Sequence, residues 1–121
     1  MSYYESHRSL SELFAGYLNQ DWKDIYVWNG TEPNYQSIIR KYKTEDSIEG
    51  INKTTTQLKD LMNIGRNFDY DEWVEVLSYD MGLGLRPKGF GISHKEWLEE
   101  VLLILGEPME ETLKHFIPER I

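Results

Sequence analysis

An apolar stripe meets a polar corner in residues 9–22, which read SLSELFAGYLNQDW. Ser9 and Glu12 have the spacing of a capping box, in which a serine and a glutamate three residues later satisfy the first backbone N–H groups of a helix. Apolar side chains then recur every three or four positions, at Leu10, Leu13, Phe14, Tyr17 and Leu18. This period is typical of a helix with one buried face. The segment therefore predicts a short helix that ends abruptly in the polar corner.

Helical patterns continue along most of the chain. Further helix starts are expected at Thr31 with Pro33, at Asp46 or Ser47, at Asp69 with Glu72, and at Ser93 with Glu96. Gly65, in the left-handed conformation, is expected to end the second of these, and three threonines at 54–56 predict a break in its middle. A short last helix should follow Pro108. Because no alternating segments joined by a hairpin turn occur, we predict an all-α fold.

The length and composition predict one domain. The chain has 121 residues, 40% of them hydrophobic, so it can bury a core. We therefore expect residues 1–121 to form a compact single-domain bundle of about five or six short helices. Without cysteine, disulfides and thiolate zinc sites are excluded. The first residues lack the apolar stretch of a signal peptide, and no run is long enough to span a membrane, so a cytoplasmic location is expected.

Charge gives the first indication of function. The net charge of −8 argues against nucleic acid or an anionic membrane as a partner. Residues 1–66 carry nine acidic and eight basic side chains, whereas residues 67–121 carry twelve and five. No lysine or arginine lies in 67–85 or in 96–113. Such acidic stretches provide solubility in many proteins, and they also suit a surface that meets a basic partner.

Enzymatic and metal-binding motifs find little support. His7, His94 and His115 are far apart and lack metal-ligand spacing, so no metal site or cofactor is expected. His94 is interpreted as a solvated surface residue. The glycines of 82–91 match no phosphate-binding motif, because neither a P-loop pattern nor a preceding strand is present. Two carboxylate pairs, Asp71 with Glu75 and Glu96 with Glu100, each share a helix face, but an exposed face does not raise a pKa for acid catalysis.

Two segments carry a resemblance to a known family. LFAGYLNQDW, residues 13–22, and GFGISHKEWLEEV, residues 89–101, resemble immunity proteins of bacterial contact-dependent growth inhibition systems. The first segment is the more specific, because the second is largely an ordinary capping box before Trp97. Residues 23–66 match this pattern only in helical character, and the tail beyond Gly106 is additional.

The resemblance implies a small helical inhibitor, not an enzyme. It would bind the C-terminal toxin domain of its cognate effector in the cytoplasm, with no direct contact to nucleic acid or membrane and no small-molecule substrate. Many such toxins are nucleases with basic clefts, so we expect a nuclease, in the first instance an RNase, whose active site the acidic protein would occlude. The residues expected to contact the toxin are Asp69, Asp71, Glu72, Glu75, Tyr79, Glu96, Glu99 and Glu100.

The same resemblance favours a structural interpretation of the polar corner. Asn19 would take the left-handed conformation after the helix. Gln20 and Asp21 would bond backbone groups, and Trp22 would bury its ring.

Two other functions remain open from the sequence. One is an acidic intracellular adaptor for a different basic protein, and the other is a carboxylate-based hydrolase.

Overall fold

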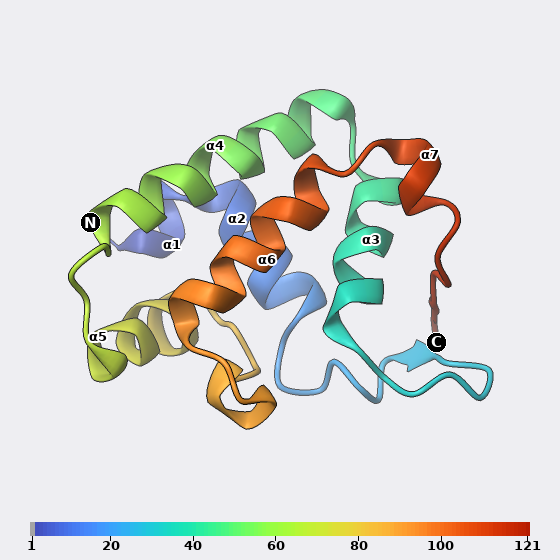
Figure 1. Ribbon diagram of the computed structural model, residues 1–121, viewed down its shortest axis with the longest axis horizontal. Coiled ribbons are helices and arrows are strands. Elements are labelled where there is room, and N and C mark those ends of the chain that lie inside the picture. Colours follow the sequence, from blue (N-terminus) through green and yellow to red (C-terminus); the bar gives the residue numbers. More distant parts are fainter. Residues whose placement is uncertain (1) are drawn as a thin grey trace.

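Helix α6 (His94–Gly106) lies at the centre of the computed structural model, which describes residues 2–121 (Figure 1). It packs between α4 (Ile48–Ile64) and α3 (Tyr35–Glu45), with α2 (Arg8–Glu12) behind it. The remaining helices are α1 (Tyr3–Ser6), α5 (Tyr70–Val74) and α7 (Met109–Thr112). The described residues thus contain seven α-helices, which confirms the all-α prediction with more helices than expected.

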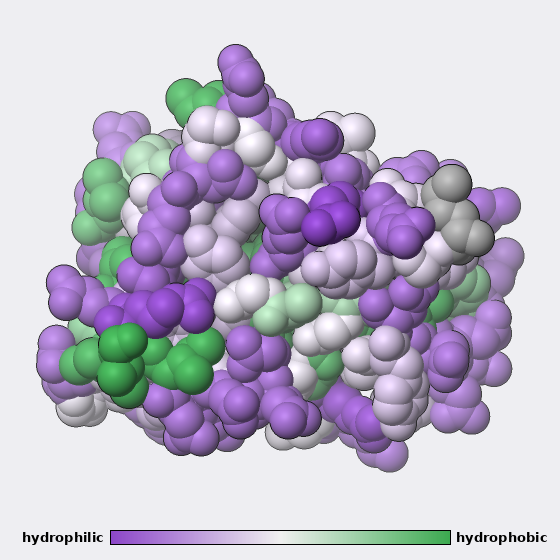
Figure 2. Space-filling model, turned by 180° about the vertical axis from the view of Figure 1, so that it is seen from behind, coloured by the Kyte–Doolittle hydropathy of each residue, from purple (hydrophilic) through white to green (hydrophobic). Residues whose placement is uncertain are grey.

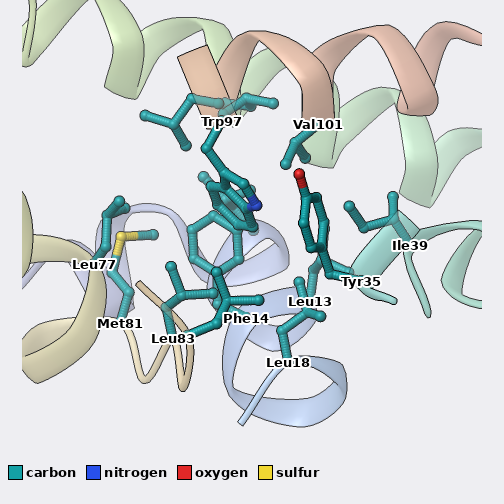
Figure 3. Packing of buried hydrophobic residues seen from close by; sticks show 14 of the residues in the cluster. Leu13, Phe14, Leu18, Tyr35, Ile39, Leu77, Met81, Leu83, Trp97 and Val101 are labelled. Atoms are coloured by element: carbon teal, nitrogen blue, oxygen red, sulfur yellow. The ribbon is translucent and has the colours of Figure 1, made fainter. Parts of the chain in front are cut away.

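The core forms where these helices face one another (Figure 3). Trp97 is fully buried, and its ring lies 5.7 Å from that of Phe14 and 5.8 Å from that of Tyr35. Trp22 and Trp73 belong to the same buried cluster. Since a tryptophan ring carries a large apolar area, these three side chains link the first third of the chain to its C-terminal half.

The first helical segment starts earlier than the sequence suggested. Ser2 caps α1, and Ser9 lies inside α2 instead of capping it. After Glu12 the helix widens into a π-helix, η1 (Leu13–Tyr17), in which the Leu18 N–H reaches the Leu13 carbonyl at 3.3 Å. A second π-helix, η2 (Glu75–Asp80), continues α5 in the same way. The apolar stripe nevertheless faces the core as expected, because most of its side chains are buried.

The polar corner turns through a different set of bonds from those expected. Asn19 is not left-handed, since Asn29 alone among the described non-glycine residues has a positive φ. Instead, the Asn19 side-chain oxygen accepts a bond from the Asp21 N–H at 2.9 Å, and the Trp22 N–H donates to the Asn19 carbonyl. The side chains of Gln20 and Asp21 are exposed. The corner is therefore a tight turn closed by Asn19 itself, and it directs Trp22 into the core.

A glycine from a loop that is distant in the sequence packs against this corner. The Gly84 N–H donates to the Leu18 carbonyl at 2.6 Å. A Cβ atom at Gly84 would lie 2.0 Å from backbone atoms of Asn19 and Gln20. The loop after η2 therefore packs backbone to backbone on the corner, which no residue with a side chain permits.

Of the four helix starts expected between residues 31 and 96, three are present and one is not. Capping boxes form at Asp69 with Glu72 and at Ser93 with Glu96, and Ser47 caps α4. Helix α3 begins at Tyr35 with Asn34 as its cap, because residues 28–31 close a separate turn in which Asn29 and Gly30 have positive φ. The prediction at Thr31 was therefore wrong.

Two details of α4 also differ from expectation. The helix runs without a break, because Thr54 is buried and its hydroxyl bonds to the Tyr42 hydroxyl at 2.6 Å. Gly65 has a φ of −90° and is not left-handed. A Cβ atom at Gly65 would lie 2.4 Å from the Trp73 ring, so this glycine makes room for an aromatic side chain.

A buried lysine closes the far end of α6. Lys43 is 2% exposed, and its ammonium donates to the carbonyls of Ile104 and Glu107 and to the Thr112 hydroxyl at 2.6–2.7 Å. Burial lowers the pKa of Lys43. These bonds add to the backbone bond that the Ile104 carbonyl accepts from the Glu107 N–H, and they tie α3 to α6 and α7.

The C-terminal residues return to the first third of the chain. Strand β2 (Glu119–Arg120) pairs antiparallel with β1 (Tyr26–Val27), an element that the sequence did not predict. The Arg120 guanidinium lies over the rings of Tyr17 and Tyr26 and donates to the Gly16 carbonyl. Seen from behind, the surface is mostly hydrophilic, and apolar atoms gather towards this end (Figure 2).

Candidate functional site

The two acidic segments begin side by side in space. The His94 ring, in the first turn of α6, lies 5.1 Å from the ring of Tyr70 and is stacked on that of Trp73 at 6.4 Å. A shallow depression of about 310 Å³ opens between the two helix starts. The two helices that carry the residues predicted to contact the toxin therefore start next to each other on the surface, although their first residues are 24 positions apart in the sequence (94 − 70).

Three of the predicted contact residues take part in the N-terminal capping boxes of α5 and α6. The Asp69 carboxylate accepts the Glu72 N–H at 2.8 Å, and the Glu72 carboxylate accepts the Asp69 N–H at 3.3 Å. Glu96 is bonded in the same way to Ser93, and the resulting hydrogen bonds lower the pKa of Glu96. Asp69, Glu72 and Glu96 are thus exposed charges whose geometry is fixed by capping.

A second set has no such role. Asp71, Glu75 and Tyr79 follow one another at four-residue intervals and are exposed, with Tyr79 71% exposed. Glu99 is exposed on α6. Within residues 2–121 the side chains of these four residues make no hydrogen bond or ion pair. They are the predicted contact residues most available to a partner.

Glu100 differs from its exposed neighbours. It is half-buried against α3, where its carboxylate accepts bonds from the Tyr35 hydroxyl and from the Gln36 amide, the latter at 3.2 Å. Burial first, and the bond to Glu100 second, raise the pKa of Tyr35. The expectation that Glu96 and Glu100 share a fully solvated face was therefore wrong for Glu100.

Basic side chains interrupt the acidic surface. The Lys88 ammonium lies 5.5 Å from the centre of the Tyr70 ring, and Lys95 lines the depression beside it. Both come from residues 86–95, between the two stretches that lack bases in the sequence. The surface around the two helix starts is thus mixed in charge.

His94 is a core residue and not the solvated residue expected. It is 4% exposed because the rings of Tyr70 and Trp73 cover it. Burial, and then the nearby positive charge of Arg86, lower the pKa of His94 below 6.5. The imidazole is consequently neutral at physiological pH and packs as an aromatic group.

This burial predicts a pH dependence of stability. On acidification the unfolded chain binds a proton at His94 before the folded chain does, so the contribution of the neutral ring is complete above pH 6.5 and is lost as the pH falls through the lowered pKa. The rings of Tyr70 and Trp73 and the charge of Arg86 act on His94, and Asp69, Lys88 and Lys95 line the same depression. We expect the free energy of unfolding, measured with urea, to fall less between pH 7.5 and pH 5.5 for His94→Gln than for the wild type. Equal losses would contradict this assignment.

Metal-ligand clusters and the exposed carboxylate pair of residues 71 and 75 were the remaining candidates for chemistry in the described chain. No three His, Asp or Glu side chains of residues 2–121 come together as metal ligands. Asp71 and Glu75 lie on the open surface, and neither is desolvated as a general acid requires. Among the helices of residues 2–121, none has the length and apolar character to cross a membrane.

These features define a small helical protein that presents charged side chains on an open surface. The chain belongs to the CdiI immunity protein family, whose model matches residues 6–105. It also shares its fold with a chain of a crystal structure described as the CdiA-CT/CdiI complex from Y. kristensenii 33638, with a TM-score of 0.74 and 20% sequence identity over 88% of this chain and all of that chain. No protein with a curated description matches the chain.

Proposed function

We propose that the protein neutralises the toxin domain of a CdiA effector by binding to it in the cytoplasm. The family match over residues 6–105 is the observation that supports this proposal most directly. The similar structure is of a CdiA-CT/CdiI complex, which supports a toxin domain as the partner. Protection would come from the complex itself, without turnover of any substrate.

The charge distribution supports a basic toxin, and a nuclease is the class that fits best. Nucleases bind phosphate backbones through clusters of lysine and arginine. The exposed carboxylates of Asp71, Glu75 and Glu99 offer an acidic surface to such a cluster. Opposite charges on two partners accelerate their encounter, and occupation of the cleft excludes its substrate.

Titration of the inhibition tests the proposal. The cognate CdiA toxin domain is mixed with increasing amounts of this protein, and the toxin's activity on RNA and DNA is measured. We expect inhibition to be complete at one equivalent, because a binding protein acts stoichiometrically. Full protection at a small fraction of one equivalent would instead indicate an enzyme that modifies the toxin. Absence of a complex would contradict the proposal as a whole.

Charge reversal tests the role of the exposed carboxylates. We expect the triple substitution of Asp71, Glu75 and Glu99 to lysine to slow association about tenfold or more at low salt, because steering contributes at least that factor. The helices should remain folded, since all three side chains are exposed and both capping boxes are retained. Rate constants from surface plasmon resonance at several salt concentrations measure the effect.

A matched control carries the same change of charge elsewhere. Asp24, Glu49 and Glu110 are exposed and lie outside α5, η2 and α6. Their reversal to lysine should slow association much less, because screening limits the reach of surface charges to ~8 Å at physiological salt. If both triple variants associate at the same rate, net charge alone matters and the predicted surface does not contact the toxin.

A further inference from the structure

A groove beside α6 combines a fixed carboxylate with an exposed aromatic ring. It has a volume of about 580 Å³ and lies between the start of α3, the 3-10 helix η3 (Pro87–Phe90) and α6. Its lining includes Glu32, Tyr35 and Gln36 from the start of α3 and the turn before it, Phe90 from η3, and Glu100 from α6. The sequence interpretation included Glu100 but missed the rest of the groove, although Phe90 between two glycines was a visible signal.

The charges of the groove have one sign. Its charged lining residues are Glu32 and Glu100, and no lysine or arginine of residues 2–121 lines it. The Glu100 carboxylate is held by the Tyr35 hydroxyl and the Gln36 amide. Each carboxylate oxygen keeps a second lone pair for a further donor. A group that is already fixed loses little conformational entropy when a ligand binds to it.

The aromatic wall has a shape that suits a planar cation. Phe90 is 46% exposed, whereas the Tyr35 ring that it meets edge-on at 5.1 Å is buried. The exposed ring packs on Tyr35, whose hydroxyl donates to Glu100, and Phe90 and Glu100 both line the groove. A guanidinium can stack on an aromatic face while it donates two bonds to a carboxylate, whereas an ammonium is a compact charge that lacks this fork.

We propose that this groove receives an arginine side chain of the toxin domain, with the guanidinium stacked on Phe90 and paired with Glu100. The inference rests on the proposed function, since it names the contact that anchors the complex. Under this proposal the acidic residues have two different roles in binding. Asp71, Glu75 and Glu99 steer the encounter from the open surface, and Glu100 holds the partner once it is bound.

Two adjacent glutamates provide the test. Glu100→Gln removes the charge of the groove and keeps an oxygen that can accept the Tyr35 bond, whereas Glu99→Gln makes the same change of charge on the exposed face. Each variant is bound to the toxin domain by surface plasmon resonance at 0.15 and 0.5 M salt. We expect Glu100→Gln to dissociate at least about tenfold faster at both salt concentrations and Glu99→Gln to dissociate at the wild-type rate, because only a desolvated pair acts on dissociation.

A second variant tests the aromatic wall without disturbing the carboxylate. Phe90→Ala should also speed dissociation. In the double variant with Glu100→Gln, the fold-increase in the dissociation rate should be smaller than the product of the two single fold-increases, because both residues hold the same arginine side chain. Thermal unfolding establishes that each variant is folded. If the wild-type complex forms and Glu100→Gln and Phe90→Ala dissociate as the wild type does, the groove is not the anchor and the proposed function stands. If the wild type itself does not bind, the proposed function fails and the anchor fails with it.

Discussion

Replacing Gly84 with alanine is expected to lower the free energy of unfolding by about 3 kcal/mol, at the upper end of what overpacking costs. The new Cβ atom would lie 2.0 Å from backbone atoms of Asn19 and Gln20. Neither backbone can rotate away as a side chain could, and the loop would have to give up the 2.6 Å bond from the Gly84 N–H to the Leu18 carbonyl. Urea denaturation followed by tryptophan fluorescence measures the change.

Gly89→Ala is the matched control for this prediction. Gly89 lies five positions farther along the chain in η3, and no heavy atom lies within 4 Å of the place where its Cβ would be. Its substitution should leave stability almost unchanged. Equal stabilities of the two alanine variants would show that the corner does not depend on close contact with Gly84.

Trp22→Ala is expected to cost ~3–5 kcal/mol, the usual range for deleting a buried tryptophan ring. Trp22 is 4% exposed and belongs to the same core cluster as Trp97. The turn at Asn19 directs the Trp22 ring into the core. Removing the ring therefore removes the apolar contacts that this turn makes possible. Chemical denaturation of the purified variant gives the difference in the free energy of unfolding.

Trp28→Ala supplies the comparison, because Trp28 is only partly buried and its ring packs at the edge near Phe116. This control should cost clearly less than Trp22→Ala. If Trp22→Ala unfolds at the wild-type urea concentration, the corner is not a structural element and a role in toxin contact becomes the better interpretation.

The sequence predicted those features whose partners are close along the chain. A capping box joins residues three positions apart, so Asp69 with Glu72 and Ser93 with Glu96 were visible in the sequence and are present. Helical periodicity is equally local, which explains why the all-α class was predictable. The helix start at Thr31 failed because a turn at Asn29 and Gly30 competes with it.

Features that depend on distant partners could not be predicted in this way. Glu100 looks like its neighbour Glu99 until Tyr35, 65 positions earlier, is placed beside it. His94 has the sequence context of a solvated first-turn residue, and only the rings of α5 bury it. Lys43 is one of three bases within four residues of α3, and nothing local marks it as the one that meets the end of α6.

The same limit applies to charge. Each of the two stretches, 67–85 and 96–113, contains no lysine or arginine. In the folded protein, however, Lys88 and Lys95 line the depression between the starts of α5 and α6. A count along the chain therefore overestimates how acidic the surface is at that point. Asp71, Glu75 and Glu99 are nevertheless exposed.

The two π-helices affect how this chain can be compared with its relatives. A π-helical turn contains one residue more than an α-helical turn. Each of η1 and η2 is the last turn of its helical segment, because no helical residue directly follows Tyr17 or Asp80. A relative whose segment ended in an ordinary α-helical turn would be one residue shorter there, and an ungapped alignment would place the following loop one residue out of register. Alignments of this family should therefore allow a single-residue gap where these two segments end.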